Sequence, residues 1–278
     1  MLKLGYSTCP NDTFIFDALV HSKIDHAPGF ETTLADVSEL NDLSLRGALD
    51  ITKISFGVIA MASKDYQILD SGSALGFGCG PLLIAKEITP SVDEWIKTAT
   101  IAIPGAKTTA NLLLSMAYPE TGKRIPFLFS EIEDAVLNGR VDAGLIIHEN
   151  RFTFEEKGLK KLIDLGAFWE QKTGLPIPLG CIAVKRSLPE EEKKSIQNKI
   201  RESVEYAFKN PDSSLEYVSK LAQTMNPDVM RMHIQLYVNE FSVSLGKRGR
   251  AAVSRLLEEG QKTGILPKPV NPLFVDQD

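Results

Sequence analysis

The chain has 278 residues, of which 43% are hydrophobic and 24% are charged, as in an ordinary globular protein large enough for two lobes. Its 31 basic and 36 acidic residues give a net charge of −5, and no cluster of Lys or Arg offsets it. This balance argues against a nucleic-acid partner. No basic leader opens the chain and no apolar run reaches the roughly 18 residues of a membrane span, so we expect a cytoplasmic protein.

The cysteines are few and scattered. Cys9, Cys79 and Cys181 form no CxxC pair, and no histidine stands near them in the sequence at the spacing of metal ligands. The pattern argues against a zinc site and against a disulfide framework. An odd number of cysteines fits the reducing environment of the cytosol. We therefore expect no metal.

Short apolar runs alternate with amphipathic segments through the first half of the chain. The expected strands are 2–7, 30–36, 50–56, 81–86, 98–105, 125–130 and 143–147. The expected helices are 12–23 with Asp12 as N-cap, 38–47 with Ser38 as N-cap, 108–118 and 130–139. Alternation of strand and helix predicts an α/β fold with mixed, mostly parallel sheets flanked by helices.

The second half of the chain has a different pattern. Four consecutive helices are expected, at 189–210, 211–223, 227–241 and 246–264, followed by a non-helical strap. Pro189, Pro211 and Pro227 stand at positions typical of a first helical turn, and Gly264 marks a stop.

Two apolar runs opened by Gly or Pro, 80–86 and 178–186, lie about a hundred residues apart and are candidates to cross between lobes. They predict a first lobe made of 1–84 and 184–278, with a second lobe of 85–183 inserted in it. Two α/β lobes joined by two crossing strands leave a cleft between them, which is a usual place for a small ligand.

Polar residues stand at the ends of four expected strands, where α/β sheets place their ligands. The candidates are Ser7 and Asn11 after the first strand, Lys53 and Ser55 at the end of the third, Thr108 and Thr109 at the start of a helix, and His148 after the run 143–147. A helix N-terminus that follows a Gly turn is a ready anion site, because its free N–H groups point at the ligand.

Each candidate also has a purely structural interpretation. His148 could cap a strand, Thr108 could only cap a helix, and Lys53 could be a solvated edge residue or the counter-ion of a carboxylate. The other histidines, His21, His26 and His233, are typical of structural positions on or beside helices. The stretch GFGCGP at 76–81 is not a dinucleotide loop, since no strand–loop–helix unit with a following acidic residue surrounds it.

Six segments in order resemble the 1,4-dihydroxy-6-naphthoate synthase family of the futalosine route to menaquinone. They are STCPNDTFIFDAL, TKIS, PGAKTTANLLL, AGLIIHENRFTF, LGAFWEQKTGLPIPLG and YVNEFS, and the resemblance runs from about residue 3 to residue 275. A small departure is the pair Ile54 and Phe56, where the family varies between aliphatic and aromatic side chains.

The resemblance implies the two-lobed fold of type 2 periplasmic binding proteins in a cytosolic enzyme. The implied reaction converts cyclic dehypoxanthinyl futalosine to 1,4-dihydroxy-6-naphthoate and dihydroxyacetone, without a metal or organic cofactor. His148 corresponds to the family's proposed general base. The TKxS stretch and the Thr pair correspond to substrate contacts, which here are Lys53, Ile54, Ser55, Thr108 and Thr109. The partner is a small molecule bearing a carboxylate, and a homodimer stays open.

Two other functions remain possible at this point. One is a non-catalytic solute-binding protein of the same fold, against which the missing signal peptide argues. The other is the chorismate dehydratase of the same pathway, which shares the fold. The segments IIHENRFTF and STCPNDTF fit the naphthoate synthase better.

Overall fold

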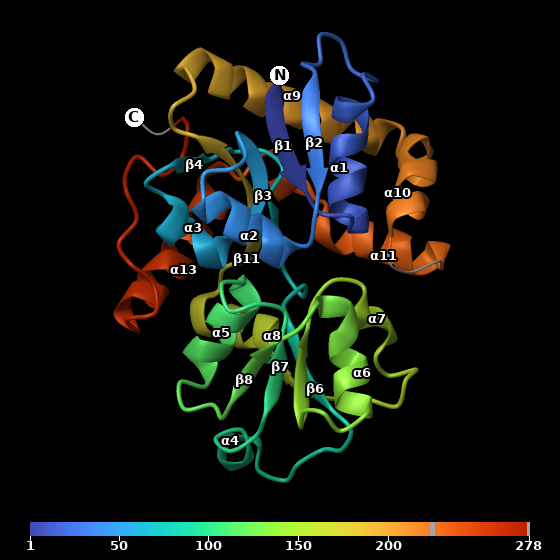
Figure 1. Ribbon diagram of the computed structural model, residues 1–278, viewed down its shortest axis with the longest axis vertical. Coiled ribbons are helices and arrows are strands. Elements are labelled where there is room, and N and C mark those ends of the chain that lie inside the picture. The colour runs from blue at the N-terminus through green and yellow to red at the C-terminus, as the bar shows by residue number, and fades with distance from the viewer. Residues whose placement is uncertain (223–225, 277–278) are drawn as a thin grey trace.

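The computed structural model describes residues 1–222 and 226–276, which form two sheets stacked end to end with helices around them (Figure 1). The first and the last described residues lie beside the larger sheet, and the middle of the chain builds the smaller one. The architecture is the predicted α/β fold. Among the described residues, no helix combines the length and the apolar composition needed to cross a membrane.

The larger sheet has the strand order β2-β1-β3-β11-β4, and a further strand, β5, pairs with β11. Its strands are β1 (Leu2–Tyr6), β2 (Phe30–Leu34), β3 (Ile51–Ser55), β4 (Tyr66–Ile68), β5 (Ala74–Gly76) and β11 (Ile177–Lys185). Every residue of β3 is buried, including Lys53 in its middle and Ser55 at its end. A polar pair inside a fully buried strand indicates a site rather than a solvated edge.

The smaller sheet has the order β10-β6-β9-β7-β8. Its strands are β10 (Lys160–Asp164), β6 (Leu82–Ala85), β9 (Ala143–Ile146), β7 (Ile101–Ile103) and β8 (Arg124–Pro126). The short central strands are apolar and wholly buried, as the sequence predicted for sheets covered on both faces.

Both sheets are mixed, as predicted, but the expectation that their pairings are mostly parallel is wrong. Among the described residues, four strand pairings are parallel and five are antiparallel, and each antiparallel pairing involves β6 or β11. These are the two runs expected to cross between lobes. A buried apolar run reads the same in either direction, so the sequence pattern could not reveal their orientation.

The strand pairing also bears on the expected boundaries. β6 pairs along its whole length within the smaller sheet, and β11 pairs within the larger one. The chain therefore leaves the larger sheet before Leu82 and returns to it between Asp164 and Ile177. Both points come before the expected boundaries at 84 and 184. The division into lobes 1–84 with 184–278 and 85–183 stays a prediction.

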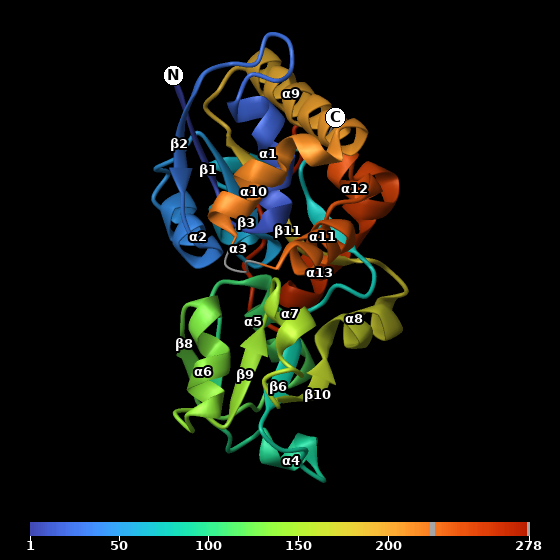
Figure 2. The same cartoon turned by 90° about the vertical axis from the view of Figure 1, so that its right-hand side faces the viewer.

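Helices cover both sheets (Figure 2). Around the larger sheet are α1 (Pro10–Val20), α2 (Val37–Leu45), α3 (Phe56–Ala62), α9 (Glu190–Lys209), α10 (Leu215–Leu221), α11 (Pro227–Tyr237), α12 (Glu240–Val243) and α13 (Gly246–Lys262). Around the smaller sheet are α4 (Val92–Trp95), α5 (Thr109–Ala117), α6 (Ile132–Leu137), α7 (Asn150–Thr153) and α8 (Leu165–Thr173). In α9, buried Ile196, Ile200 and Val204 recur every four residues, which gives the helix one apolar face toward the core that includes Phe14 and Phe16 of α1.

Two expected helix caps are wrong. Helix α1 begins at Pro10 with Cys9 as N-cap, so Asp12 lies inside the first turn, where its side chain is free for other contacts. Helix α2 is capped by Asp36, whose side chain accepts a hydrogen bond from the backbone N–H of Ser38.

The C-terminal helices are shorter than expected. The segment 211–223 forms a 3-10 turn, η2 (Pro211–Ser214), followed by α10, and the expected end at 223 lies outside the described residues. The expected helix 227–241 divides into α11 and α12, because Asn239 starts a new helix with a capping box. Pro189 is the N-cap of α9 rather than a first-turn residue.

Candidate active site

A cleft between the two sheets holds about 640 Å³ of space not filled by protein atoms, part of which is open to solvent. Its wall on the larger-sheet side comes from the start of α1, the end of β3, β11 and the end of α11. Its other wall comes from the start of α5 and the turn after β9. The lining residues are Ser7, Asn11, Asp12, Val37, Lys53, Ser55, Ala74, Cys79, Pro81, Thr108, Thr109, Ala110, Ile147, His148, Leu179, Gly180 and Tyr237.

The structure brings seven of the eight expected site residues to this cleft, namely Ser7, Asn11, Lys53, Ser55, Thr108, Thr109 and His148. Ile54 is the exception, because it is fully buried and belongs to the hydrophobic core. Successive side chains of a strand point to opposite faces, so Ile54 faces away from its neighbours Lys53 and Ser55.

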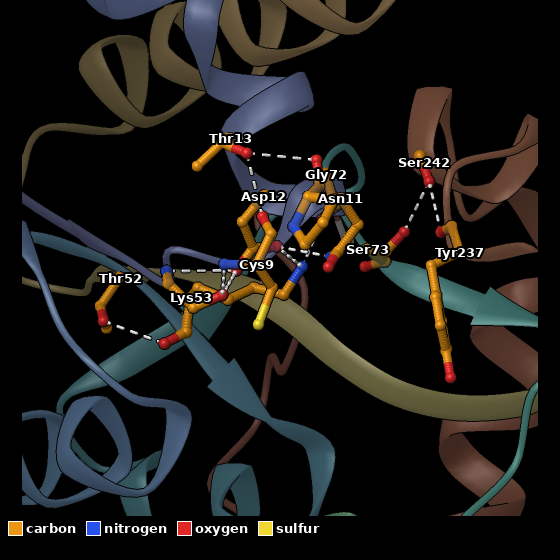
Figure 3. A network of polar contacts seen from close by, with 12 residues as sticks. Cys9, Asn11, Asp12, Thr13, Thr52, Lys53, Gly72, Ser73, Tyr237 and Ser242 are labelled. Atoms are coloured by element: carbon orange, nitrogen blue, oxygen red, sulfur yellow. Dashed lines mark hydrogen bonds and ion pairs between the residues drawn. The ribbon is translucent and has the colours of Figure 1, made fainter. Parts of the chain in front are cut away.

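Lys53 has a carboxylate partner inside the protein. Its Nζ lies 2.8 Å from Oδ1 of Asp12, and the two side chains are 6% and 2% exposed (Figure 3). Asp12 Oδ2 also accepts a hydrogen bond from Ser7 Oγ at 2.7 Å, and Lys53 donates to the Gly72 carbonyl at 3.2 Å. This pairing fixes the ammonium group at the cleft wall before any ligand arrives.

Ser55 is held in a similar way by a residue that the sequence did not indicate. Asn41 of α2 donates from Nδ2 to Ser55 Oγ at 3.0 Å and accepts from the Ser55 backbone N–H at 2.9 Å. These two bonds set the end of β3 against α2.

The start of α5 meets the start of α3 across the cleft. Thr109 Oγ1 accepts from the Gly57 N–H at 2.9 Å and donates to the Leu179 carbonyl at 2.7 Å. A residue beside the smaller sheet is thereby bonded to α3 and β11 of the larger one. Of the two candidate caps, Thr108 and Thr109, Thr108 is the N-cap of α5 and accepts from the Asn111 N–H. The N–H groups of the first turn lack acceptors within the helix and can bind an anion.

His148 follows β9 in a turn and has a positive φ of 59°, a conformation uncommon for residues other than Gly. The imidazole lines the cleft, and its ring centroid lies 4.8 Å from that of Phe129. Its Nε2 is buried and has no hydrogen-bond partner. Its Nε2 therefore does not make the backbone hydrogen bond of the structural interpretation.

A hydrogen-bond chain connects Lys53 to His233, a histidine that we expected to be structural. Asn11 donates from Nδ2 to Asp12 Oδ1 at 2.8 Å, which leaves its carbonyl oxygen to accept from His233 Nε2 at 2.9 Å. Burial, and then the neighbouring His148, hold the pKa of His233 well below its usual value. The lowered pKa favours the neutral ring, and the tautomer with a proton on Nε2 is the one that can donate to the Asn11 carbonyl oxygen.

The sequence also missed Glu149 and Cys9. One ligand atom from each of Cys9, His148 and Glu149 lies within 4.8 Å of the others, although the sequence showed no histidine near a cysteine. Both oxygens of the Glu149 carboxyl are buried without a hydrogen-bond partner. Tyr237 from α11 adds a phenol to the cleft, and burial raises its pKa well above the ordinary range.

The cleft lies between two α/β halves, and its walls carry a histidine, a buried ammonium and a helix N-terminus. These groups are suited to a small anionic ligand beside a potential base. The chain belongs to the menaquinone biosynthesis family, whose family model matches residues 2–262.

Two relatives are named 1,4-dihydroxy-6-naphthoate synthase. The protein of Streptomyces coelicolor is 43% identical, with 96% of this chain and 95% of that protein covered. The protein of Thermus thermophilus is 41% identical, with 99% of each covered.

Solved structures agree with this fold. Protein AF1704 from Archaeoglobus fulgidus superimposes with a TM-score of 0.90 at 32% identity, over 95% of this chain and 98% of that one. The alkanesulfonate-binding protein SsuA from Xanthomonas axonopodis, bound to MOPS, superimposes with a TM-score of 0.72 over 97% of this chain and 95% of that one. Its identity of 13% shows the fold alone, which is the periplasmic-binding-protein fold that the resemblance implied.

Proposed function

We propose that this protein is a carbon–carbon lyase that converts cyclic dehypoxanthinyl futalosine to 1,4-dihydroxy-6-naphthoate and dihydroxyacetone, with His148 as general base. The family and the two similarly named relatives support the reaction. The observation that carries the role of His148 is its imidazole at the cleft wall, with an Nε2 that no protein group occupies.

The reaction needs a proton acceptor and donors for negative charge. Imidazole is the side chain that most often accepts protons near neutral pH. Removal of a proton from the substrate starts cleavage of the bond to the polyhydroxylated fragment, and aromatisation of the ring drives it forward. A base and preorganised donors suffice for this chemistry, so the proposal includes no organic cofactor.

We further propose that the substrate carboxylate binds beside Lys53, Ser55, Thr108 and Thr109, with Ser7 and Asn11 nearby. The Lys53 ammonium supplies charge, although Asp12 shares it. Since Thr108 and Thr109 already make hydrogen bonds within the protein, the free N–H groups at the start of α5 are the better donors.

The test compares His148→Asn with His26→Asn. Asn is chosen because it tolerates a positive φ, and His26 is a matched control, since it also has a positive φ (51°) but lies on the surface outside the cleft. We expect His148→Asn to lower kcat by roughly 10²–10⁴-fold, with substrate affinity and Tm close to those of the parent. His26→Asn is expected to change none of these.

Formation of the naphthoate product is followed by absorbance, and substrate affinity by calorimetry. Full activity in folded His148→Asn would remove His148 from the mechanism. Chorismate is supplied in a parallel reaction. Turnover of chorismate alone would show a dehydratase, and binding without turnover of either compound would show a solute-binding protein.

We also propose a cytoplasmic location. Cys9, Cys79 and Cys181 are all free and buried, which fits a reducing compartment. Neither nucleic acid nor membrane is among the proposed partners, and a homodimer stays open.

A further inference from the structure

Three potential metal ligands meet beside the cleft wall that carries His148, and they come from two segments far apart in sequence. Cys9 is the N-cap of α1, just beyond β1 of the larger sheet, whereas His148 and Glu149 stand in the turn after β9 of the smaller sheet. One ligand atom from each lies within 4.8 Å of the other two. Ligand atoms around a tetrahedral zinc ion are about 3.3–3.8 Å apart, so modest side-chain movements would close the cluster on a metal.

Unpartnered polar atoms in the cluster point independently to a bound cation. Glu149 is 5% exposed, and neither of its carboxyl oxygens has a hydrogen-bond partner. The Nε2 atom of His148 is also buried and without a partner. An ionised carboxylate taken from water without a partner is costly, and a positive ion between these atoms would remove the cost.

Among the described residues, no lysine or arginine forms an ion pair with Glu149. Nδ1 of His233 lies 3.6 Å from Glu149 Oε2, beyond hydrogen-bond distance. Lys53, the ammonium of the cleft, pairs instead with Asp12.

We propose that Cys9, His148 and Glu149 form a zinc-binding site that bridges the two halves of the cleft. A thiolate, an imidazole and a carboxylate suit Zn²⁺, whereas Mg²⁺ and Ca²⁺ prefer oxygen ligands alone. Three protein ligands leave a fourth position for water. On binding, the Cys9 thiol gives up its proton to solvent and a sulfur–zinc bond forms. The charges of Zn²⁺, one thiolate and one carboxylate then cancel, which suits a buried site.

Zinc at this site would oppose the proposed reaction. An imidazole that ligates a metal has no lone pair at that nitrogen to accept a proton, so His148 cannot bind zinc there and act as the base at the same time. The inference rests on the proposed function only for this inhibitory effect. The binding site itself stands on the geometry of the three side chains.

The binding test uses the full chain, freed of metal with a chelator and titrated with Zn²⁺ by calorimetry. We expect one ion per chain in the parent protein, and an affinity at least about 100-fold weaker in Cys9→Ala and in Glu149→Gln. Cys181→Ala is the matched control, because Cys181 is equally buried but lies in β11 outside the cluster. Its affinity is expected to equal that of the parent. Co²⁺ should give a near-ultraviolet thiolate-to-metal absorption band that Cys9→Ala abolishes.

Failure of the inference and failure of the proposed function are distinguishable. Absence of stoichiometric zinc binding, or binding that Cys9→Ala and Glu149→Gln leave unchanged, would overturn the site whatever the activity. If the protein turns over its substrate, zinc should inhibit the parent and Cys181→Ala alike, and Cys9→Ala should need at least about 100-fold more zinc. Equal inhibition of the parent and folded Cys9→Ala would also count against the site.

Discussion

The ion pair of Lys53 with Asp12 predicts a large and asymmetric loss of stability when either side chain is changed. Removing one partner of a buried pair costs about 3–5 kcal/mol, because a charge is left buried without compensation. In Lys53→Met, Asp12 keeps its hydrogen bonds from Ser7 and Asn11, so the free energy of unfolding should decrease by about 3 kcal/mol. In Asp12→Asn, Lys53 keeps its hydrogen bond to the Gly72 carbonyl at 3.2 Å, so the free energy of unfolding should decrease by about 5 kcal/mol.

The free energy of unfolding is measured by urea denaturation at pH 7 for both single variants and for the double variant. Since the double variant leaves no unpaired charge, we expect it to lose at least about 2 kcal/mol less than the sum of the single losses. Lys185 and Asp50 supply the control pair. Their atoms are 3.1 Å apart on the same sheet, but their side chains are 26% and 22% exposed, and single changes there should cost at most about 1 kcal/mol.

Losses below about 1 kcal/mol for both Lys53→Met and Asp12→Asn would refute the reasoning, because a pair buried to this degree cannot be that weak if both groups are charged. A double variant whose loss equals the sum of the single losses would refute it as well, since it would show that the two side chains do not interact.

Three further predictions concern the stability of the protein and residues at or beside the cleft. Gly57→Ala should lower the free energy of unfolding by about 1–3 kcal/mol in urea, because its Cβ would lie 2.8 Å from backbone atoms of Thr108 and Thr109. Thr109→Val should cost about 1–3 kcal/mol in the same assay by leaving the Leu179 carbonyl and the Gly57 N–H unpaired, whereas an unchanged value would show that water replaces the hydroxyl. Since the pKa of His233 is lowered on folding, the unfolded chain binds a proton that the folded protein excludes, and stability should fall as the pH drops below about 6.5, by at most about 1.4 kcal/mol per pH unit. A stability curve from pH 7.5 to 5 that His233→Gln does not flatten would contradict this linkage.

The sequence predicted much of the α/β framework because alternating elements and fully buried strands leave plain patterns. Lys53 and Ser55 were recognisable as candidates, since polar side chains inside an otherwise apolar buried strand are rare. Thr108 was recognisable as a helix cap after a Gly turn. Both features can be recognised within one short segment of the sequence.

The missed residues depend on contacts between distant segments. His233 lies on α11, more than two hundred positions from Asn11, and nothing in the helix around it indicates that its ring bonds to the cleft wall. Cys9 reaches His148 and Glu149 only because β1 and β9 end on opposite sides of one cleft. Asp12 was mistaken for a cap because an acidic residue before an apolar run is typical of helix starts, while Pro10 starts the helix two residues earlier.

The polar groups of the cleft divide into those that already have partners and those that do not. Lys53, Ser55 and Thr109 are bonded to other parts of the protein, so their positions are set before a ligand enters. Among the described residues at and beside the cleft, the buried atoms without a hydrogen-bond partner include His148 Nε2, His233 Nδ1 and the Glu149 carboxyl oxygens. Preorganised groups stabilise charge without reorganisation during the reaction, whereas a group with a free lone pair can take a proton. It follows that changes at Thr109 should affect stability first, and that His148→Asn should lower turnover in a protein that stays folded.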